Sequence, residues 1–265
     1  MVWGEAAERS ARSAAILGRR SAAATIGGMQ IGTLPRCYAL VPCAGVGQRA
    51  GAAGPKQYKS VAGRAMVAHT LAALAQVARI EATLVVLSPD DKQFEFAAPD
   101  HIGARAWVAR CGGATRAETV AHGLVELQAR GVQPHDWVLV HDAARCLLQP
   151  AWVDRLIDAC LDDEVGGLLA LPLADTLKQA EGGRVQSTVD RTGKWAAQTP
   201  QMFRAGLLLP ALRMAGDAVT DESSAIEALG HAPKLILGDL TNLKVTWPED
   251  FVLAERLMKG LNGIP

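Results

Sequence analysis

Two glycines and two cations lie in one short segment, residues 42–58, which begins Pro-Cys-Ala-Gly-Val-Gly-Gln-Arg and ends Pro-Lys-Gln-Tyr. Gly45 and Gly47 lack a Cβ atom, so the backbone amides beside them can approach a polyphosphate closely. Arg49 and Lys56 bring two positive charges within reach of the same anion. The combination predicts a loop that binds a nucleoside triphosphate, and a surface turn with two solvated cations is the simpler alternative.

The spacing of this segment distinguishes it from two common phosphate loops. A Walker A loop needs G-x-x-x-x-G-K-[ST], and no such lysine and hydroxyl follow a glycine here. Residues 45–50 do fit the G-x-G-x-x-A pattern of dinucleotide-binding proteins. In that pattern a helix begins at the glycines, whereas Gly51, Gly54 and Pro55 prevent a helix before about Gly63. The acidic residue that should follow about twenty positions later is also missing, so the sequence disfavours a dehydrogenase.

A glycine pair before a predicted helix marks a second candidate site. Gly112 and Gly113 precede Thr115 and Glu118, which have the spacing of a capping box. Free amides and the positive end of the helix dipole would face an anion there. A plain strand–turn–helix connection explains the capping box equally well, but it does not explain Arg116, a cation where the dipole disfavours one.

Two further polar residues lie late in predicted strands or directly after them. Asp142 follows the apolar run 136–140, at the edge where open α/β sheets bind ligands, and could hold a sugar hydroxyl or Mg²⁺. An ion pair with Arg145 in the same loop is the alternative. Lys244, on a predicted short strand at 242–246, is a candidate third phosphate contact, although a single lysine on a strand is more often an edge residue.

These candidate residues need a scaffold, and the hydrophobic pattern supplies an alternation of strands and helices. Continuous apolar runs of this kind are typical of parallel strands that are buried on both faces, so the sequence predicts an α/β fold with a twisted, mostly parallel sheet flanked by helices. The predicted strands are 38–41, 82–88, 104–109, 136–140, 167–172 and 235–237. Predicted helices are 64–78, 152–161 and 204–214, with others beginning near Thr115, Asp221 and Pro248.

The alternation stops between residues 173 and 201. Turn signals at 181–184 and 191–194 separate three short extended pieces, the last of them at 195–199. Such pieces carry too little apolar surface to be stable alone, so we expect a protruding arm that the parent domain or a second subunit supports. Three polar residues of this arm, which by themselves are ordinary exposed residues, are Thr176, Arg191 and Thr199.

Composition excludes several broad classes of partner. The chain has 265 residues, of which 49% are hydrophobic and 20% charged, and its 27 basic residues balance 27 acidic ones. No global field therefore attracts nucleic acid or an anionic membrane, and no apolar run is long enough to span one. The five cysteines form no C-x-x-C pair, which indicates a reducing compartment and small buried residues rather than a zinc site.

The first 35 residues are rich in Ala, Ser, Arg and Gly and have little apolar periodicity. We expect residues 1–35 to be a disordered or mis-assigned tail, with Met29 as an alternative start. Glu5 and Glu8 disfavour a plastid transit peptide, and no apolar core of a signal peptide follows the arginines.

Eight segments, taken in order and spacing, resemble the 2-C-methyl-D-erythritol 4-phosphate cytidylyltransferase family of the non-mevalonate isoprenoid pathway. The resemblance covers about residues 37–258. Each motif is weak evidence by itself, but eight motifs in the same order and spacing are strong evidence. The segments are 42–49 with 55–58, 112–119, 140–145, 175–178, 189–193, 198–201, 220–222 and 242–250.

The resemblance implies transfer of a cytidylyl group from CTP to methylerythritol phosphate with release of pyrophosphate. It also implies a Rossmann-like nucleotidyltransferase fold, Mg²⁺ carried mainly by the CTP phosphates, a cytoplasmic location and a homodimer with crossed arms. Residues 36–265 would then form one catalytic domain with its dimerisation arm at about 173–201. Because little chain follows the last helix, we expect no second synthase domain there.

The family motifs assign roles residue by residue. The positions that match transition-state stabilisers are Arg49 and Lys56. Those that match residues positioning the substrate phosphate are Lys244 and, from the partner's arm, Arg191. Matches to nucleotide contacts are Ala44, Gly45, Gly47, Gly113, Thr119 and Ala143, and matches to substrate contacts are Asp142, Thr176 and the partner's Thr199. Departures from the family pattern beside these positions are Cys43, Cys146 and Trp247.

Two other functions fit parts of the same pattern. A cytidylyltransferase for another polyol phosphate, such as ribitol 5-phosphate, would use a similar loop. A non-catalytic nucleotide-binding protein of the same fold would be expected to lack Arg49, Lys56 or Lys244, and all three are present.

Overall fold

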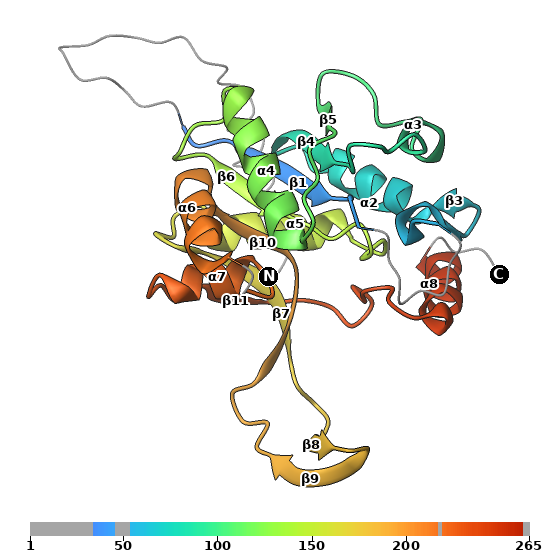
Figure 1. The fold of residues 1–265 in the computed structure, drawn as a ribbon, viewed down its shortest axis with the longest axis vertical. Coiled ribbons are helices and arrows are strands. Elements are labelled where there is room, and N and C mark those ends of the chain that lie inside the picture. Colours follow the sequence, from blue (N-terminus) through green and yellow to red (C-terminus); the bar gives the residue numbers. More distant parts are fainter. Residues whose placement is uncertain (1–33, 46–53, 217–218, 262–265) are drawn as a thin grey trace, which may run out of the picture. The chain divides into compact units, whose positions relative to one another are not determined.

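A twisted sheet organises the chain. The computed structural model describes residues 34–45, 54–216 and 219–261, and within these ranges seven strands form one sheet (Figure 1). β10 is antiparallel to both of its neighbours, and the other pairings are parallel, so the predicted mostly parallel sheet is confirmed. In spatial order the strands are β11 (Lys234–Leu237), β7 (Gly166–Pro172), β10 (Trp195–Arg204), β6 (Trp137–Val140), β1 (Cys37–Pro42), β4 (Ile80–Val86) and β5 (Ala106–Ala109).

Helices cover both faces of this sheet. One face carries α2 (Met66–Ala75), α5 (Pro150–Cys160) and the short α3 (Phe94–Ala97). The opposite face carries α4 (Arg116–Ala129), α6 (Ala205–Ala215) and α7 (Glu222–Ala228). Outside the sheet, its covering helices and the arm lie the 3-10 turn η2 (Lys56–Tyr58), the ribbon of β2 (Ser60–Val61) and β3 (Arg64–Ala65), and α8 (Pro248–Leu261). No helix among the described residues is long and apolar enough to cross a bilayer.

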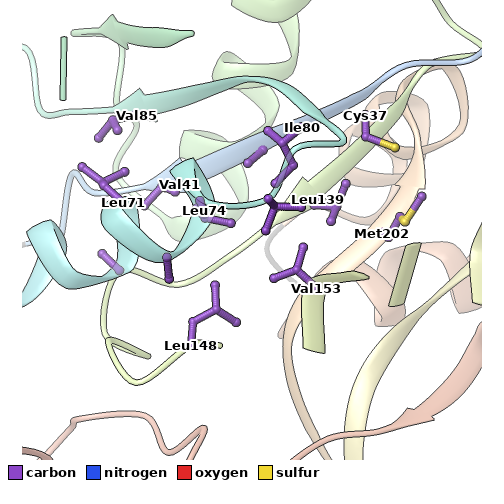
Figure 2. Close-up of a cluster of buried hydrophobic side chains, with 14 of the residues drawn as sticks. Cys37, Val41, Leu71, Leu74, Ile80, Val85, Leu139, Leu148, Val153 and Met202 are labelled. Atoms are coloured by element: carbon purple, nitrogen blue, oxygen red, sulfur yellow. The ribbon is translucent and has the colours of Figure 1, made fainter. Parts of the chain in front are cut away.

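The central strand β1 shows why both faces are apolar. Successive side chains of a strand point to opposite faces, so Ala39 and Val41 pack with α2 and α5, whereas Tyr38 and Leu40 pack with α4 and α6. Figure 2 shows the first of these clusters, in which side chains of the sheet meet Leu71 and Leu74 of α2. Burial on both faces explains the continuous hydrophobic runs in the sequence.

Two predicted extended segments differ from the structure. The piece at 195–199, expected to belong to the arm, is the first half of β10 and pairs with β7 in the main sheet. The pairing of this piece with β7 could not be predicted, because the buried part of β10 begins only at Gln198. Residues 195–197 are exposed, as most residues of the arm are. The predicted strand at 242–246 is not a strand; side-chain hydrogen bonds and a backbone bond from Val245 N to Ala144 O (2.8 Å) hold it instead.

The arm itself is a two-stranded hairpin. β8 (Leu177–Glu181) pairs with β9 (Arg184–Val189) through a Gly182–Gly183 turn in which both glycines have positive φ (56° and 76°). Figure 1 shows the hairpin beyond the ends of β7 and β10. Most of its side chains are exposed, so it has no core of its own.

Residues 35–265 form one compact unit. The predictions for the N-terminal tail fall almost entirely on residues 1–33, outside the described residues. Four cysteines are buried, at positions 37, 43, 146 and 160, as expected for small core residues. Burial raises the pKa of the Cys146 thiol to about 11 and that of the Cys160 thiol to about 12, so neither is a thiolate at neutral pH.

Candidate active site

A cleft of about 690 Å³ opens at the carboxyl ends of β1 and β6, beside the first turn of α4. The chain visits β4 on one side of β1 and β6 on the other, and open α/β sheets bind ligands where the strand order reverses in this way. Eight of the residues to which the family motifs assign roles line this cleft: Ala44, Gly45, Lys56, Gly113, Thr119, Asp142, Ala143 and Lys244.

A row of four alternating charges runs from one wall of the cleft into the protein interior. Asp142 receives a different cation on each carboxylate oxygen: Arg116 Nε at 2.8 Å on Oδ1 and Lys244 Nζ at 2.7 Å on Oδ2. The two terminal nitrogens of Arg116 bind both oxygens of Glu222, at 2.7 and 3.0 Å. The expected alternative, Asp142 paired with Arg145, is wrong, because the Arg145 guanidinium donates to the carbonyls of Asn242 and Ala197.

The charge row fixes the ionisation of Asp142. Burial alone would raise the pKa of this carboxyl, but the Arg116 and Lys244 charges outweigh it and hold the pKa well below its usual range. Burial raises the pKa of Glu222, and the Arg116 guanidinium opposes that effect. Two carboxylates on one guanidinium raise the pKa of Arg116, although burial acts against them. Asp142 is therefore a carboxylate at neutral pH.

The unexpected cation at the start of α4 now has a structural reason. Thr115 and Glu118 form the predicted capping box, with Glu118 N–H donating to Thr115 Oγ1 at 3.1 Å. Arg116 offsets its unfavourable position at the helix start through its two carboxylate partners. The sequence alone marks Arg116 as unusual for a helix start but indicates no role for it.

A tight contact between two strand-end loops shapes the floor of the cleft. A Cβ atom on Gly112 would collide with the Cβ of Ala44 and lie 2.8 Å from the carbonyl oxygen of Leu87. Only glycine therefore lets the two loops approach. Beside it, Gly113 N–H donates to Thr119 Oγ1 (3.1 Å), which in turn donates to the Thr115 carbonyl (2.9 Å), so Thr119 secures the loop before α4.

Lys56 reaches the cleft from the η2 turn. Its Nζ donates to the carbonyl of Val245 at 3.0 Å, which brings the Lys56 and Lys244 segments together although they lie far apart in sequence. The buried Gln57 donates to the carbonyl of Cys43 at 3.0 Å and ties the same turn to the end of β1. Two cations thus approach one cleft from separate, anchored segments.

His141 and Thr199 lie beneath Asp142. His141 Nε2 lies 3.2 Å from the Arg145 carbonyl, which can only accept, so this nitrogen carries the proton. Nδ1 then accepts from Thr199 Oγ1 at 3.0 Å, and the same hydroxyl accepts from Asp142 N–H at 3.1 Å. Complete burial lowers the pKa of His141 to about 4, so the ring is neutral and serves to orient its neighbours.

The Lys244 segment is anchored on β10. Asn242 is fully buried and donates to the Thr199 carbonyl (2.9 Å) and to Gln198 Oε1 (3.2 Å). Because these bonds join positions more than forty apart in the chain, no local pattern could have revealed the role of Asn242.

The structure does not bring every candidate residue to the cleft. Thr176 and Arg191 are exposed in the arm region, and Thr199 is buried behind Asp142 of its own chain. Gly47 and Arg49 lie outside the described residues. The roles assigned to all of these residues, and to those that line the cleft, stay predictions.

The chemistry available in the cleft is electrostatic. Among the described residues no group of three or more His, Cys, Asp or Glu is placed to hold a metal ion. What the cleft does offer is glycine-rich backbone, a helix N-terminus, two lysines and one ionised carboxylate, a set suited to binding and aligning phosphate groups.

A doubly covered, mostly parallel sheet with such a cleft at its switch point defines a Rossmann-like nucleotidyltransferase. The comparison with protein families is in agreement: residues 37–260 match the model described as "IspD: 2-C-methyl-D-erythritol 4-phosphate cytidylyltransferase". The chain belongs to this family.

Individual relatives agree with the family. The chain is 55% identical over 233 residues to the 2-C-methyl-D-erythritol 4-phosphate cytidylyltransferase of Laribacter hongkongensis, covering 87% of this chain and 99% of that protein. It is 60% identical over 229 residues to the bifunctional enzyme IspD/IspF of Albidiferax ferrireducens, covering 86% of this chain but 54%, about half, of the longer protein. A crystal structure of 4-diphosphocytidyl-2C-methyl-D-erythritol synthase superposes with a TM-score of 0.75 at 42% identity, covering 84% of this chain and 98% of that one.

Proposed function

We propose that this chain transfers the cytidylyl group of CTP to 2-C-methyl-D-erythritol 4-phosphate, a step of isoprenoid precursor biosynthesis. The products are 4-diphosphocytidyl-2-C-methyl-D-erythritol and pyrophosphate. Membership of the family carries the choice of substrates. The observation that supports the chemistry is the convergence of Lys56, Lys244 and the ionised Asp142 on one cleft with glycine-rich backbone.

The reaction needs alignment rather than a protein nucleophile. The acceptor phosphate is already an anion, and its oxygen attacks the α-phosphorus of CTP, with pyrophosphate as the leaving group. Two repelling anions must be held in line while charge on the phosphorus oxygens is stabilised. Lys56, with Arg49 from the segment outside the described residues, would stabilise that charge. Lys244 would hold the acceptor phosphate, exchanging part of its contact with Asp142 for one with the substrate.

Mg²⁺ belongs to the proposal as an ion carried by the substrate. The donor set fits this role, because Asp142 is the ionised carboxylate in the cleft lining and both of its oxygens already bind cations. The CTP phosphates would therefore supply most of the ligands of the ion, and Asp142 would be the protein carboxylate in the cleft lining. When bound, the ion would neutralise charge on the triphosphate.

The arm is the second part of the proposal. Thr176 and Arg191 lie on exposed backbone away from the cleft lining of their own chain. A hairpin that buries so little surface gains stability when it packs against another molecule. We therefore propose a homodimer in which Arg191 of the partner subunit, with its Thr176, completes the acceptor site. The partner's Thr199, which the family resemblance also implies at this site, is left out of the proposal because it is buried in its own chain. From its likeness to bacterial relatives, we also propose that the protein acts in the cytoplasm.

Pyrophosphate release measures the proposed function directly. Purified protein with CTP and Mg²⁺ should release pyrophosphate when 2-C-methyl-D-erythritol 4-phosphate is added. Ribitol 5-phosphate serves as the matched acceptor, because it offers the same phosphate on a different polyol. The proposal would be contradicted if pyrophosphate were released only with ribitol 5-phosphate, or if neither acceptor gave any release.

A further inference from the structure

Glu222 is a buried charge for which the proposed reaction has no use. Its side chain has no solvent exposure, and it lies in the first turn of α7, outside the lining of the cleft. Burying a carboxylate is costly unless a cation accompanies it. Arg116 is that cation, bound through both terminal nitrogens at 2.7 and 3.0 Å.

The bidentate contact determines how Arg116 meets Asp142. With both terminal nitrogens engaged by Glu222, the guanidinium presents its Nε to Asp142 Oδ1 at 2.8 Å. The other oxygen, Oδ2, stays available to Lys244 at 2.7 Å. A guanidinium released from Glu222 could instead turn its fork onto both oxygens of Asp142, the geometry that arginine prefers with a carboxylate. Glu222 thus keeps one oxygen of Asp142 facing the cleft.

The core fixes Glu222 itself. Asp221 caps α7 by accepting from Ser224 N–H at 2.9 Å, and it also accepts from Gln201 Nε2 at 2.8 Å. Gln201 is a buried residue of β10 and accepts from Ser223 N–H at 2.8 Å. The start of α7 is therefore fastened to the sheet on both sides of Glu222, and the carboxylate is a rigid reference point.

We propose that Glu222 is a positioning residue for the cytidylyl transfer, acting through Arg116 to orient Asp142 and so Lys244. The inference rests on the proposed function and extends it to a residue that lies outside the cleft lining. It predicts that Glu222 matters for turnover of the acceptor more than for binding of CTP. Alignment errors of about 1 Å can cost on the order of 10²-fold in rate.

Glu222→Gln is the direct test, because it keeps the volume and removes the charge. With CTP saturating, kcat/KM for methylerythritol phosphate should fall about 10²-fold, whereas the KM for CTP should change little. Glu227→Gln on the exposed side of α7 is the matched control and should behave as wild type. If Glu222→Gln does not fold, Glu222→Asp retains the charge and should show a smaller loss of the same kind.

A double-mutant cycle separates positioning from a merely structural role. If Glu222 acts only through Arg116, then Arg116→Met with Glu222→Gln should lose no more kcat/KM than Arg116→Met alone. Losses that multiply, or a wild-type kcat/KM in Glu222→Gln and Glu222→Asp, would overturn the inference while the proposed function stands. A wild-type protein that releases no pyrophosphate would instead overturn the proposed function, and the inference with it.

Discussion

The cleft and the arm of this molecule differ in where their polar side chains find partners. In the cleft, Asp142, Arg116 and Lys244 neutralise one another within one chain at 2.7–2.8 Å, on a framework of buried hydrogen bonds. In the arm, Arg191 and Thr176 are exposed, and the hairpin beside them buries almost nothing. One region is fixed by its own fold, whereas the other gains a defined environment only from something added to the chain. We infer that the first works within its own subunit and the second in its partner's.

The largest expected effect comes from removing a cation from the cleft. Lys56→Ala removes a cation that we place at the reacting phosphorus, so kcat should fall about 10²–10³-fold, by analogy with the loss of one oxyanion donor. The folded state should lose little stability, because Lys56 is a half-buried side chain of the cleft lining and not part of the hydrophobic core. Steady-state kinetics and thermal unfolding check both statements.

The exposed Lys92→Ala is the control for that substitution, since it removes the same charge from the surface. A kcat for Lys56→Ala within a few-fold of the Lys92→Ala value would remove Lys56 from the catalytic site.

A smaller effect is expected on the arm side. Arg191→Ala should raise the KM for the acceptor phosphate and lower kcat/KM by on the order of 10²-fold, because one charged contact to the substrate is lost. Since Arg191 is exposed in its own chain, the melting temperature should not change. Arg184→Ala, also exposed on the hairpin, is the matched control, and an equal loss there would mean that general charge on the arm matters rather than Arg191.

The smallest effect concerns how firmly the cleft is built. The folded-state pKa of His141 is about 4, below the usual value of 6.5, so the unfolded chain binds more protons between these pH values. Stability should therefore fall as the pH drops from 6.5 to about 4, by about 3 kcal/mol from this group. Below that window both states are protonated and the effect of His141 levels off.

Denaturant unfolding of wild type and His141→Gln across this pH range measures that contribution. Burial also lowers the pKa of His69 and His101, so the difference between the two proteins is diagnostic rather than the wild-type slope alone. His231→Gln at an exposed position supplies the control. Parallel curves for wild type and His141→Gln would show that the buried ring does not hold the cleft together.

Local sequence pattern was sufficient for the elements and for part of the cleft. Apolar runs predicted the buried strands, and the spacing of Thr115 and Glu118 predicted the start of α4. Asp142 and Lys56 were singled out because strand ends and glycine-rich loops are where phosphate sites form. The predicted strand at 242–246 was wrong because side chains such as Asn242 replace the ladder there.

Pattern could not supply the contacts between distant segments. Arg116 and Glu222 lie 106 positions apart, and only the packing of α7 on α6, which in turn packs on α4, brings them together. Arg116 was at least an anomaly in sequence, a cation at a helix start. Glu222 was not an anomaly, because an acidic residue in the first turn of a helix is ordinary. Its burial and its pairing with Arg116 could therefore not be inferred from the sequence.

Subunit mixing tests the contrast between cleft and arm most directly. Lys56→Ala and Arg191→Ala proteins, each expected to keep about 1% or less of the wild-type kcat/KM for the acceptor, are mixed under conditions that exchange subunits, and pyrophosphate release is measured below the KM for the acceptor. If the arm acts in the partner's site, each mixed dimer contains one site with an intact cleft and an intact arm. Activity should then return to about a quarter of the wild-type value, because half of the dimers are mixed and each has one working site of two. A mixture that stays as inactive as its components, although exchange is complete, would contradict the account.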